Sequence, residues 1–165
     1  MRRLGLDPTK AIYLKPGDFW FGCAPAHLYT ILGSCISITL WHPQRKVGGM
    51  CHYLLPKMEL SLAPQQMGRT AGEAMALFLQ AIRRYGTRPG EYQVKVFGGA
   101  SLLIESPGSL LAHQVSTQNV AAARQLLRES GFQIVSESVG GRASRKLVFD
   151  LTTGDAWQVL NAARP

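Results

Sequence analysis

Residues 30–56, TILGSCISITLWHPQRKVGGMCHYLLP, decide how this chain folds. Apolar and polar side chains alternate over residues 36–41, a period of two that is typical of a half-buried strand. The stretch HPQRK predicts a turn, and residues 47–55 form a second apolar run with the same alternation. The segment therefore predicts an antiparallel hairpin whose turn is centred near Gln44.

The hairpin places a cysteine beside a histidine. Cys35 and His52 lie at almost equal distances along the chain from Gln44, so we expect them to be cross-strand neighbours or nearly so, with a bulge at the glycines allowed for. If the two side chains share a face, their Cβ atoms are roughly 4.5 to 5.5 Å apart. Gly48 and Gly49 in the second strand indicate a bulge or a close approach of another backbone.

A cysteine and a histidine at this spacing can serve as a nucleophile and its base. The imidazole takes the proton of the thiol, and an imidazolium beside the sulfur lowers the pKa of the cysteine below its usual value of about 8.5. Gly33 and Ser34 precede Cys35, and such small residues leave backbone N–H groups free to hold an oxyanion. The residue types alone also allow a buried cysteine next to a core histidine.

Length and composition predict one domain that spans residues 1–165. Of the 165 residues, 46% are hydrophobic, which is enough for one core of ordinary size. Prolines and lysines interrupt the N-terminal segment before an apolar run of signal-peptide length develops, and no later run is long enough to cross a bilayer. We therefore expect a cytoplasmic protein without membrane insertion.

Charge and cysteine content exclude several classes of site. The 18 Lys and Arg exceed the 10 Asp and Glu, and the resulting charge of +8 favours an acidic partner. The basic residues are scattered and match no RNA- or DNA-binding motif, so no nucleic acid partner is expected. Cys23, Cys35 and Cys51 form no C-x-x-C pair and predict neither a disulfide framework nor a metal site. Cys51 falls on the strand face opposite to His52, where a buried filler is expected.

The rest of the chain predicts a mixture of helices and strands. A helix is expected within residues 66–85, where apolar residues recur at helical spacing. Residues 101–113 predict an irregular segment, followed by a second helix over residues 119–130 with Ser116 or Thr117 as its N-cap. Further strands are expected in EYQVKVF, FQIVSESV, KLVFDL and AWQVL. Strands outnumber helices, so the predicted fold class is α+β with much hairpin pairing.

Two parts of the sequence carry a family resemblance. The first is LGSCISITLWHPQRKVGGMCHYLLP, and the second runs from KVFGGASLL through Asn119, expected to open a helix, to GFQIVSESVGGRASRKLVFDLTTGDAWQV. Over residues 28–159 the chain resembles the chemoreceptor glutamine deamidase family CheD. The resemblance implies a hydrolase without a cofactor. Its fold would have packed β-sheets flanked by helices, similar to the catalytic domain of glutamine-deamidating toxins.

The resemblance also implies roles for individual residues. Cys35 would be the nucleophile and His52 the base, with an oxyanion held near Gly33 and Ser34. A threonine just before LGSC would orient the imidazole, and Thr30 is the threonine available there, with Tyr29 in the neighbouring position.

The implied reaction converts selected glutamines on the cytoplasmic helices of methyl-accepting chemotaxis receptors into glutamates, with release of ammonia. A CheC-type phosphatase is an implied partner. The run RTAGEAM at residues 69–75 and Ser116 depart from the residues usual in the family, which affects partner recognition and leaves the chemistry unchanged.

Two other functions fit parts of the sequence. A different Cys–His hydrolase, such as a peptidase or an acyltransferase, would cleave peptides or esters with the same pair. A non-catalytic adaptor that regulates a CheC-type phosphatase or a receptor array would work without Cys35. The presence of both Cys35 and His52 favours an enzyme over the adaptor.

Overall fold

The computed structural model describes residues 11–57, 68–101 and 109–162. Strands and two α-helices, with one short 3₁₀ helix (Pro89–Glu91), make up these ranges. In chain order they are β1 (Ala11–Tyr13), β2 (Phe19–Cys23), β3 (His27–Leu32), β4 (Ile36–His42), β5 (Val47–Cys51), α1 (Ala71–Arg84), β6 (Gln93–Gly98), α2 (Ser109–Glu129), β7 (Ile134–Val139), β8 (Ala143–Asp150) and β9 (Ala156–Ala162).

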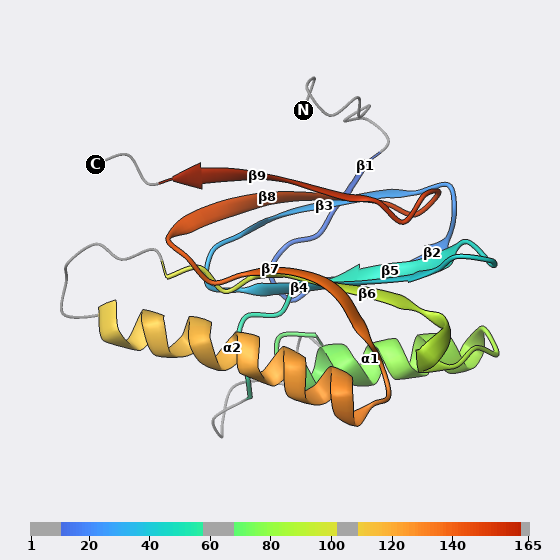
Figure 1. Cartoon of the computed structure of the whole chain (residues 1–165), viewed down its shortest axis with the longest axis horizontal. Helices are drawn as coiled ribbons and strands as arrows, with labels where there is room; N and C mark the ends of the chain where they lie inside the picture. Colours follow the sequence, from blue (N-terminus) through green and yellow to red (C-terminus); the bar gives the residue numbers. More distant parts are fainter. Residues whose placement is uncertain (1–10, 58–67, 102–108, 163–165) are drawn as a thin grey trace.

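The elements are stacked in three layers (Figure 1). One sheet has the strand order β1-β3-β8-β9, and the other has the order β2-β5-β4-β6-β7. The four-stranded sheet packs on one face of the five-stranded sheet, and α1 and α2 cover the other face. The expected α+β fold, with packed sheets flanked by helices, is confirmed.

The five-stranded sheet has an apolar core on each face. Cys51 lies in the core beneath the helices, whereas Met50, its neighbour in β5, lies in the core between the two sheets. Cys51 is fully buried and fills the helical core, as expected. Because side chains alternate along a strand, His52 continues the face of Met50 and points between the sheets.

β4 and β5 form the predicted hairpin. Leu40 pairs with Gly49 and Trp41 with Gly48, and the two glycines allow a close approach of neighbouring backbones. A Cβ atom on Gly48 would lie 2.0 Å from the Leu40 carbonyl oxygen, and one on Gly49 would lie 2.2 Å from that of Trp20. Of the two roles expected for these glycines, the close approach is therefore the one that the fold uses.

The first predicted helix is confirmed as α1. The side chain of Thr70 accepts a hydrogen bond from the Glu73 N–H, and the Glu73 carboxylate accepts one from the Thr70 N–H. This capping box fixes where the helix begins. Arg83 and Arg84 occupy its last turn, where cations interact favourably with the helix dipole.

The second helix begins earlier than predicted. α2 starts at Ser109, so the last part of the segment expected to be irregular is helical, and Asn119 lies inside the helix. Ser101 is in no helix or strand, as predicted, and residues 102–108 lie outside the described residues. Ser116 and Thr117 are not N-caps, because the Ser116 hydroxyl donates to the carbonyl of His113 within the helix. A serine can be satisfied in this way without ending a helix, so its presence is an ambiguous boundary signal.

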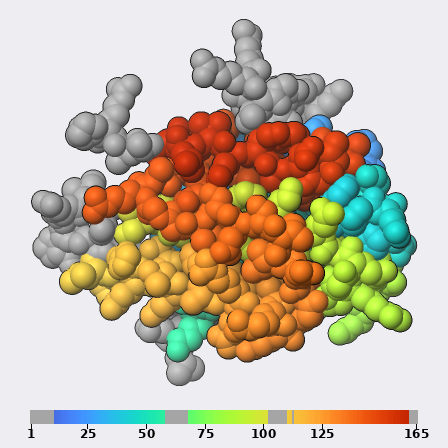
Figure 2. Space-filling view, viewed as in Figure 1, coloured from blue at the N-terminus to red at the C-terminus, as the bar shows by residue number. Residues whose placement is uncertain are grey.

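The sequence does not predict two N-terminal strands, β1 and β2. β1 is only three residues long and pairs in parallel with β3, while β2 forms the edge of the five-stranded sheet beside β5. Strands that are this short give no readable period. The later strands lie where the sequence predicts them, and Figure 2 shows that α2, β7 and β9 form much of one face of the molecule.

Replacing Gly48 tests the close packing of β4 on β5. Gly48→Ala should destabilise the protein by at least about 2 kcal/mol, because the new Cβ atom collides with the Leu40 carbonyl. Gly72→Ala is the matched control: no atom lies within 4 Å of the added Cβ, and alanine in a helix should stabilise by about 0.5 to 1 kcal/mol. Chemical denaturation of both variants measures the difference, and equal stabilities would contradict the packing argument.

Candidate active site

Thr30 and His52 meet between the two sheets. Thr30 lies in β3 and is fully buried, and His52 follows β5 with 1% of its surface exposed. The Thr30 Oγ1 atom lies 2.8 Å from His52 Nδ1 and 2.7 Å from the carbonyl oxygen of Leu14. The same carbonyl oxygen is 3.5 Å from His52 Nδ1.

These contacts determine which ring nitrogen carries the proton. A hydroxyl has one hydrogen to donate, and the Leu14 carbonyl can only accept, so Thr30 donates to Leu14. Thr30 Oγ1 then accepts from His52, and Nδ1 must be the protonated nitrogen. Within the described part of the chain, His52 Nε2 is buried and has no hydrogen-bond partner. The ring is therefore held with an unprotonated Nε2 that can accept a proton.

Cys35 lies on the same sheet face as His52. Cys35 immediately precedes β4, is half-buried, and packs against the core between the sheets. Ile36 is bridged to Tyr53, so Ser37 lies opposite His52 and Cys35 is the diagonal neighbour of the histidine. The shared face follows because Cys35 packs against the core that contains Met50, and His52 lies on the same face of the chain as Met50.

Cys35 and His52 are near neighbours across the strands, as expected, but they are diagonal and not directly paired. The turn is centred between Gln44 and Arg45, since His42 pairs with Val47, and this shifts the register from the one predicted. Diagonal neighbours are roughly 7 to 8 Å apart at Cα, with the Cβ atoms somewhat closer. Catalytic hydrogen bonds are often long or absent before substrate binds, so the arrangement remains compatible with proton transfer from thiol to imidazole.

Burial sets the protonation of both groups in the free protein. It raises the pKa of the Cys35 thiol, an effect that its own backbone N–H and the Ser34 side chain offset only in part. Burial also lowers the pKa of His52, against the opposing influence of the Leu14 carbonyl and the Asp18 carboxylate. The resting site thus favours a neutral thiol and a neutral imidazole. The lowered cysteine pKa that the sequence suggests requires a charged imidazole, and burial disfavours that charge in the free protein.

The end of β6 holds the segment that carries Cys35. The Gly99 N–H donates to the Cys35 carbonyl at 2.9 Å, and the Ala100 N–H donates to the Gly33 carbonyl at 2.8 Å. Within residues 11–57, 68–101 and 109–162, the N–H groups of Ser34 and Cys35 donate to no backbone carbonyl. They are available to hold an oxyanion, as the sequence predicts for Gly33 and Ser34.

Comparison with known proteins identifies the family. The family model described as CheD chemotactic sensory transduction matches residues 54–159, more than half of the chain. This chain belongs to the CheD family. A probable chemoreceptor glutamine deamidase CheD 3 of Dechloromonas aromatica is 46% identical over 88% of this chain and 85% of its own length.

Further CheD relatives give the same result. The probable chemoreceptor glutamine deamidase CheD 1 of Chromobacterium violaceum is 42% identical, over 90% of this chain and 76% of that protein. The Pseudomonas fluorescens protein of the same description is 38% identical, over 90% of this chain and 84% of its own. The alignments with these relatives cover 88 to 90% of this chain. An alignment of that length must include residues 30–52, so the candidate site lies within the region that the chain shares with its CheD relatives.

A solved structure also resembles the chain. The hypothetical protein YfiH of Bacillus licheniformis is 17% identical, with a TM-score of 0.48, and the match covers 73% of this chain and 50% of that one.

Among the described residues of the CheD-family chain, no helix is long and apolar enough to span a membrane. Nor do the described residues contain a group of three His, Cys, Asp or Glu side chains that could hold a metal ion.

Asn119 joins the two halves of the candidate CheD site. Its buried side-chain N–H groups donate to the Ser34 carbonyl at 3.0 Å and to the Leu54 carbonyl at 2.8 Å. The side-chain amide of Asn119 in α2 is thus hydrogen-bonded both to the residue before Cys35 and to a residue shortly after His52. Sequence reasoning assigns Asn119 only to the start of a helix; the signal for its role is a polar residue on the buried face next to Val120.

Tyr29 does not compete with Thr30 for the imidazole. Its ring packs against that of Tyr13 with centroids 5.0 Å apart, on the face of β3 opposite to Thr30. Of the two residues in neighbouring positions before LGSC, Thr30 is the one that contacts His52.

The three cysteines provide an internal test of the candidate base. Cys23 is exposed, whereas Cys51 is fully buried and burial raises its pKa to about 12. In His52→Gln, iodoacetamide labelling of Cys35 should slow at least roughly tenfold relative to Cys23, because the proton acceptor is lost. Cys51 should remain unlabelled in the folded protein.

The pH dependence of the same labelling has a definite sign. Because burial raises the pKa of Cys35, its labelling rate should continue to increase as the pH rises through and beyond the ordinary range for a cysteine. Peptide mapping by mass spectrometry separates the sites. A ratio of Cys35 to Cys23 labelling that His52→Gln leaves unchanged would show that the histidine does not activate the thiol.

Proposed function

We propose that this chain is a protein-glutamine deamidase that acts on methyl-accepting chemotaxis receptors. Cys35 is the nucleophile, His52 the general base and Thr30 the residue that orients the imidazole. The observation that carries the proposal is the hydrogen bond from His52 Nδ1 to Thr30, which leaves Nε2 unprotonated on the sheet face that Cys35 shares.

The first half of the proposed reaction forms a thioester. The Cys35 sulfur attacks the carboxamide carbon of a substrate glutamine while the thiol proton moves to His52 Nε2. The carbonyl oxygen becomes an oxyanion, to which the N–H groups of Ser34 and Cys35 can donate. The imidazolium then gives its proton to the amide nitrogen, the carbon–nitrogen bond breaks, and ammonia leaves.

The second half hydrolyses the thioester. Neutral His52 accepts a proton from water through Nε2 as the water oxygen attacks the thioester carbon. The carbon–sulfur bond breaks, the thiol regains its proton, and glutamine has become glutamate. Throughout, Thr30 and the Leu14 carbonyl stabilise the proton on Nδ1 and any positive charge on the ring.

The neutral resting pair fits this sequence of steps. A free thiolate in a permanently charged site would react with many electrophiles, whereas a neutral thiol becomes nucleophilic only as its proton moves to the histidine. The raised pKa of Cys35 and the lowered pKa of His52 both favour the neutral forms before substrate arrives.

The family relationship supports receptor glutamines as the substrate. The relatives at 38 to 46% identity carry the description of probable chemoreceptor glutamine deamidase. The net charge of +8 favours association with acidic polypeptides. The enzyme would meet the receptor helices in the cytoplasm, and a CheC-type phosphatase stays a predicted partner that would compete with the receptor for it.

Deamidation of a receptor fragment tests the proposed reaction. The protein is incubated with a glutamine-bearing cytoplasmic receptor fragment, and peptide mass spectrometry maps the conversion of amide to acid. Cys35→Ala should abolish the conversion, whereas Cys23→Ala, which removes an exposed thiol elsewhere, should retain it.

Three results would point to another function. Cleavage of the fragment would indicate a peptidase. Binding of the receptor with no ammonia released would indicate an adaptor. Conversion that survives Cys35→Ala would exclude the proposed nucleophile.

Thr30 variants separate orientation from chemistry. Thr30→Ala should lower the deamidation rate only in part, because an orienting group commonly contributes less than the nucleophile or base that it supports. Thr30→Ser should retain more activity, since its hydroxyl can still bridge His52 and Leu14. Rates are compared with thermal melting curves of the same samples. Full activity in a normally folded Thr30→Ala would remove Thr30 from the mechanism.

A further inference from the structure

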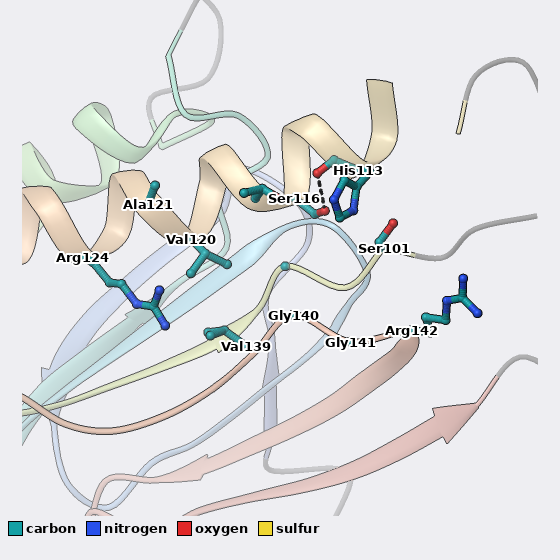
Figure 3. Close-up of a pocket in the computed structure, with 12 residues that line it drawn as sticks. Ser101, His113, Ser116, Val120, Ala121, Arg124, Val139, Gly140, Gly141 and Arg142 are labelled. Atoms are coloured by element: carbon teal, nitrogen blue, oxygen red, sulfur yellow. Dashed lines mark hydrogen bonds between the residues drawn. The ribbon is translucent and has the colours of Figure 1, made fainter. Parts of the chain in front are cut away.

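A cleft opens beside the nucleophile segment, between the first half of α2 and the turn that joins β7 to β8 (Figure 3). His113 and Arg124 project from the helix on one side, and Gly140 and Arg142 lie on the other. Gly99 forms part of the floor, where a Cβ atom would lie 2.5 Å from a methyl group of Val120. The cleft has a volume of about 530 Å³, which is enough for a few side chains of a bound polypeptide.

The floor of the cleft is joined directly to the nucleophile segment. Gly99 donates its N–H to the Cys35 carbonyl, and the neighbouring Gly98 accepts from the Gly140 N–H at 2.9 Å. The Ser101 N–H, on the same floor, donates to the Gly141 carbonyl at 2.8 Å. A polypeptide in the cleft would therefore rest on the backbone that holds Cys35 in place.

One unpaired arginine lies at the rim of the cleft, and a buried arginine lies next to its Gly140 wall. Arg142 is exposed at its rim and forms no ion pair among the described residues. Arg145 is 5% exposed and donates to the Gly140 carbonyl at 2.7 Å, and within the described ranges no carboxylate pairs with it. Arg124 is neutralised by Glu137, whose pKa it lowers.

No carboxylate offsets this charge from inside the cleft. None of the described lining residues is Asp or Glu. A buried cation without a carboxylate partner produces a field that water screens only weakly. Arg142, at the rim, therefore makes the cleft favourable for an anionic group. Arg145 is not a lining residue, and it adds positive charge only through the Gly140 backbone that it contacts.

We propose that this cleft binds the stretch of receptor polypeptide beside the target glutamine, and that Arg142 selects for a side-chain carboxylate in that stretch. The inference rests on the proposed function and assigns to it a specificity-determining residue. The apolar Val120 and Val139 in the walls can pack against aliphatic parts of the bound segment. The guanidinium of Arg142 can bind a carboxylate with two hydrogen bonds.

Ser101 adds a polar group to the same floor. It is 8% exposed, and its hydroxyl has no hydrogen-bond partner among the described residues. A buried hydroxyl without a partner is unfavourable, and a bound polypeptide can supply one. This second observation points to a ligand independently of the arginines.

The test compares two charge reversals of equal size. Arg142→Glu alters the cleft, and Arg83→Glu alters an exposed position in the last turn of α1. With the receptor fragment as substrate, Arg142→Glu should raise KM for deamidation at least tenfold and leave kcat within about twofold. Arg83→Glu should change KM less than twofold, and iodoacetamide labelling of Cys35 should be unchanged in both.

A matched pair of peptides tests the carboxylate directly. One carries a glutamate near the target glutamine, and the other carries a glutamine in place of that glutamate. The wild-type protein should deamidate the first with the higher kcat/KM, and Arg142→Gln should remove most of this preference. The preference should also weaken with added salt, because an exposed ion pair is screened.

The outcomes distinguish the two proposals. If the wild-type protein deamidates the fragment but Arg142→Glu behaves like Arg83→Glu, the cleft assignment is overturned and the proposed function stands. Equal use of the two peptides by the wild-type protein would likewise overturn the carboxylate selection. If the wild-type protein converts no glutamine at all, the proposed function fails and the inference fails with it.

Discussion

One hydroxyl hydrogen determines the chemistry available to this site. Thr30 has a single proton, the Leu14 carbonyl takes it, and His52 must therefore present a protonated Nδ1 to the threonine oxygen. The contact also joins the two sheets, since Thr30 belongs to the four-stranded sheet and His52 follows a strand of the five-stranded sheet. The tautomer of the base thus depends on the packing of one sheet against the other.

The sequence predicts the parts of the fold whose signals are local. The hairpin of β4 and β5 and the helix α1 each show a clear period, and α1 has a capping box at its first turn. The start of α2 is mispredicted because Ser116 satisfies its hydroxyl inside the helix, where the sequence pattern resembles an N-cap. β1 has three residues and depends on pairing with β3, which is a tertiary interaction.

In the candidate site too, the sequence identifies the residues but does not predict the tertiary contacts between them. Motifs in the sequence identify Cys35, His52 and Thr30 as the candidates, but the relation between them depends on the hairpin register. A shift of the turn centre by half a residue moves that register by one residue. The role of Asn119 requires that α2 be placed across two segments that are distant in sequence. The directions of the pKa shifts follow from burial by elements that are not adjacent in sequence, so the sequence could not supply them.

The walls of the cleft contribute no side chain to the trio of Thr30, Cys35 and His52, although its floor is bonded to the backbone of Cys35. In the proposed assignment, chemistry and target choice therefore depend on different residues. After gene duplication, substitutions on the outer surface of α2 and in the β7–β8 turn can redirect one copy to a new target while its reaction stays intact. Gly99 cannot vary as freely, because its φ is +66° and an added Cβ atom would lie 2.5 Å from a methyl group of Val120. Diversification in such a lineage is expected to concentrate around the rim and to spare the floor.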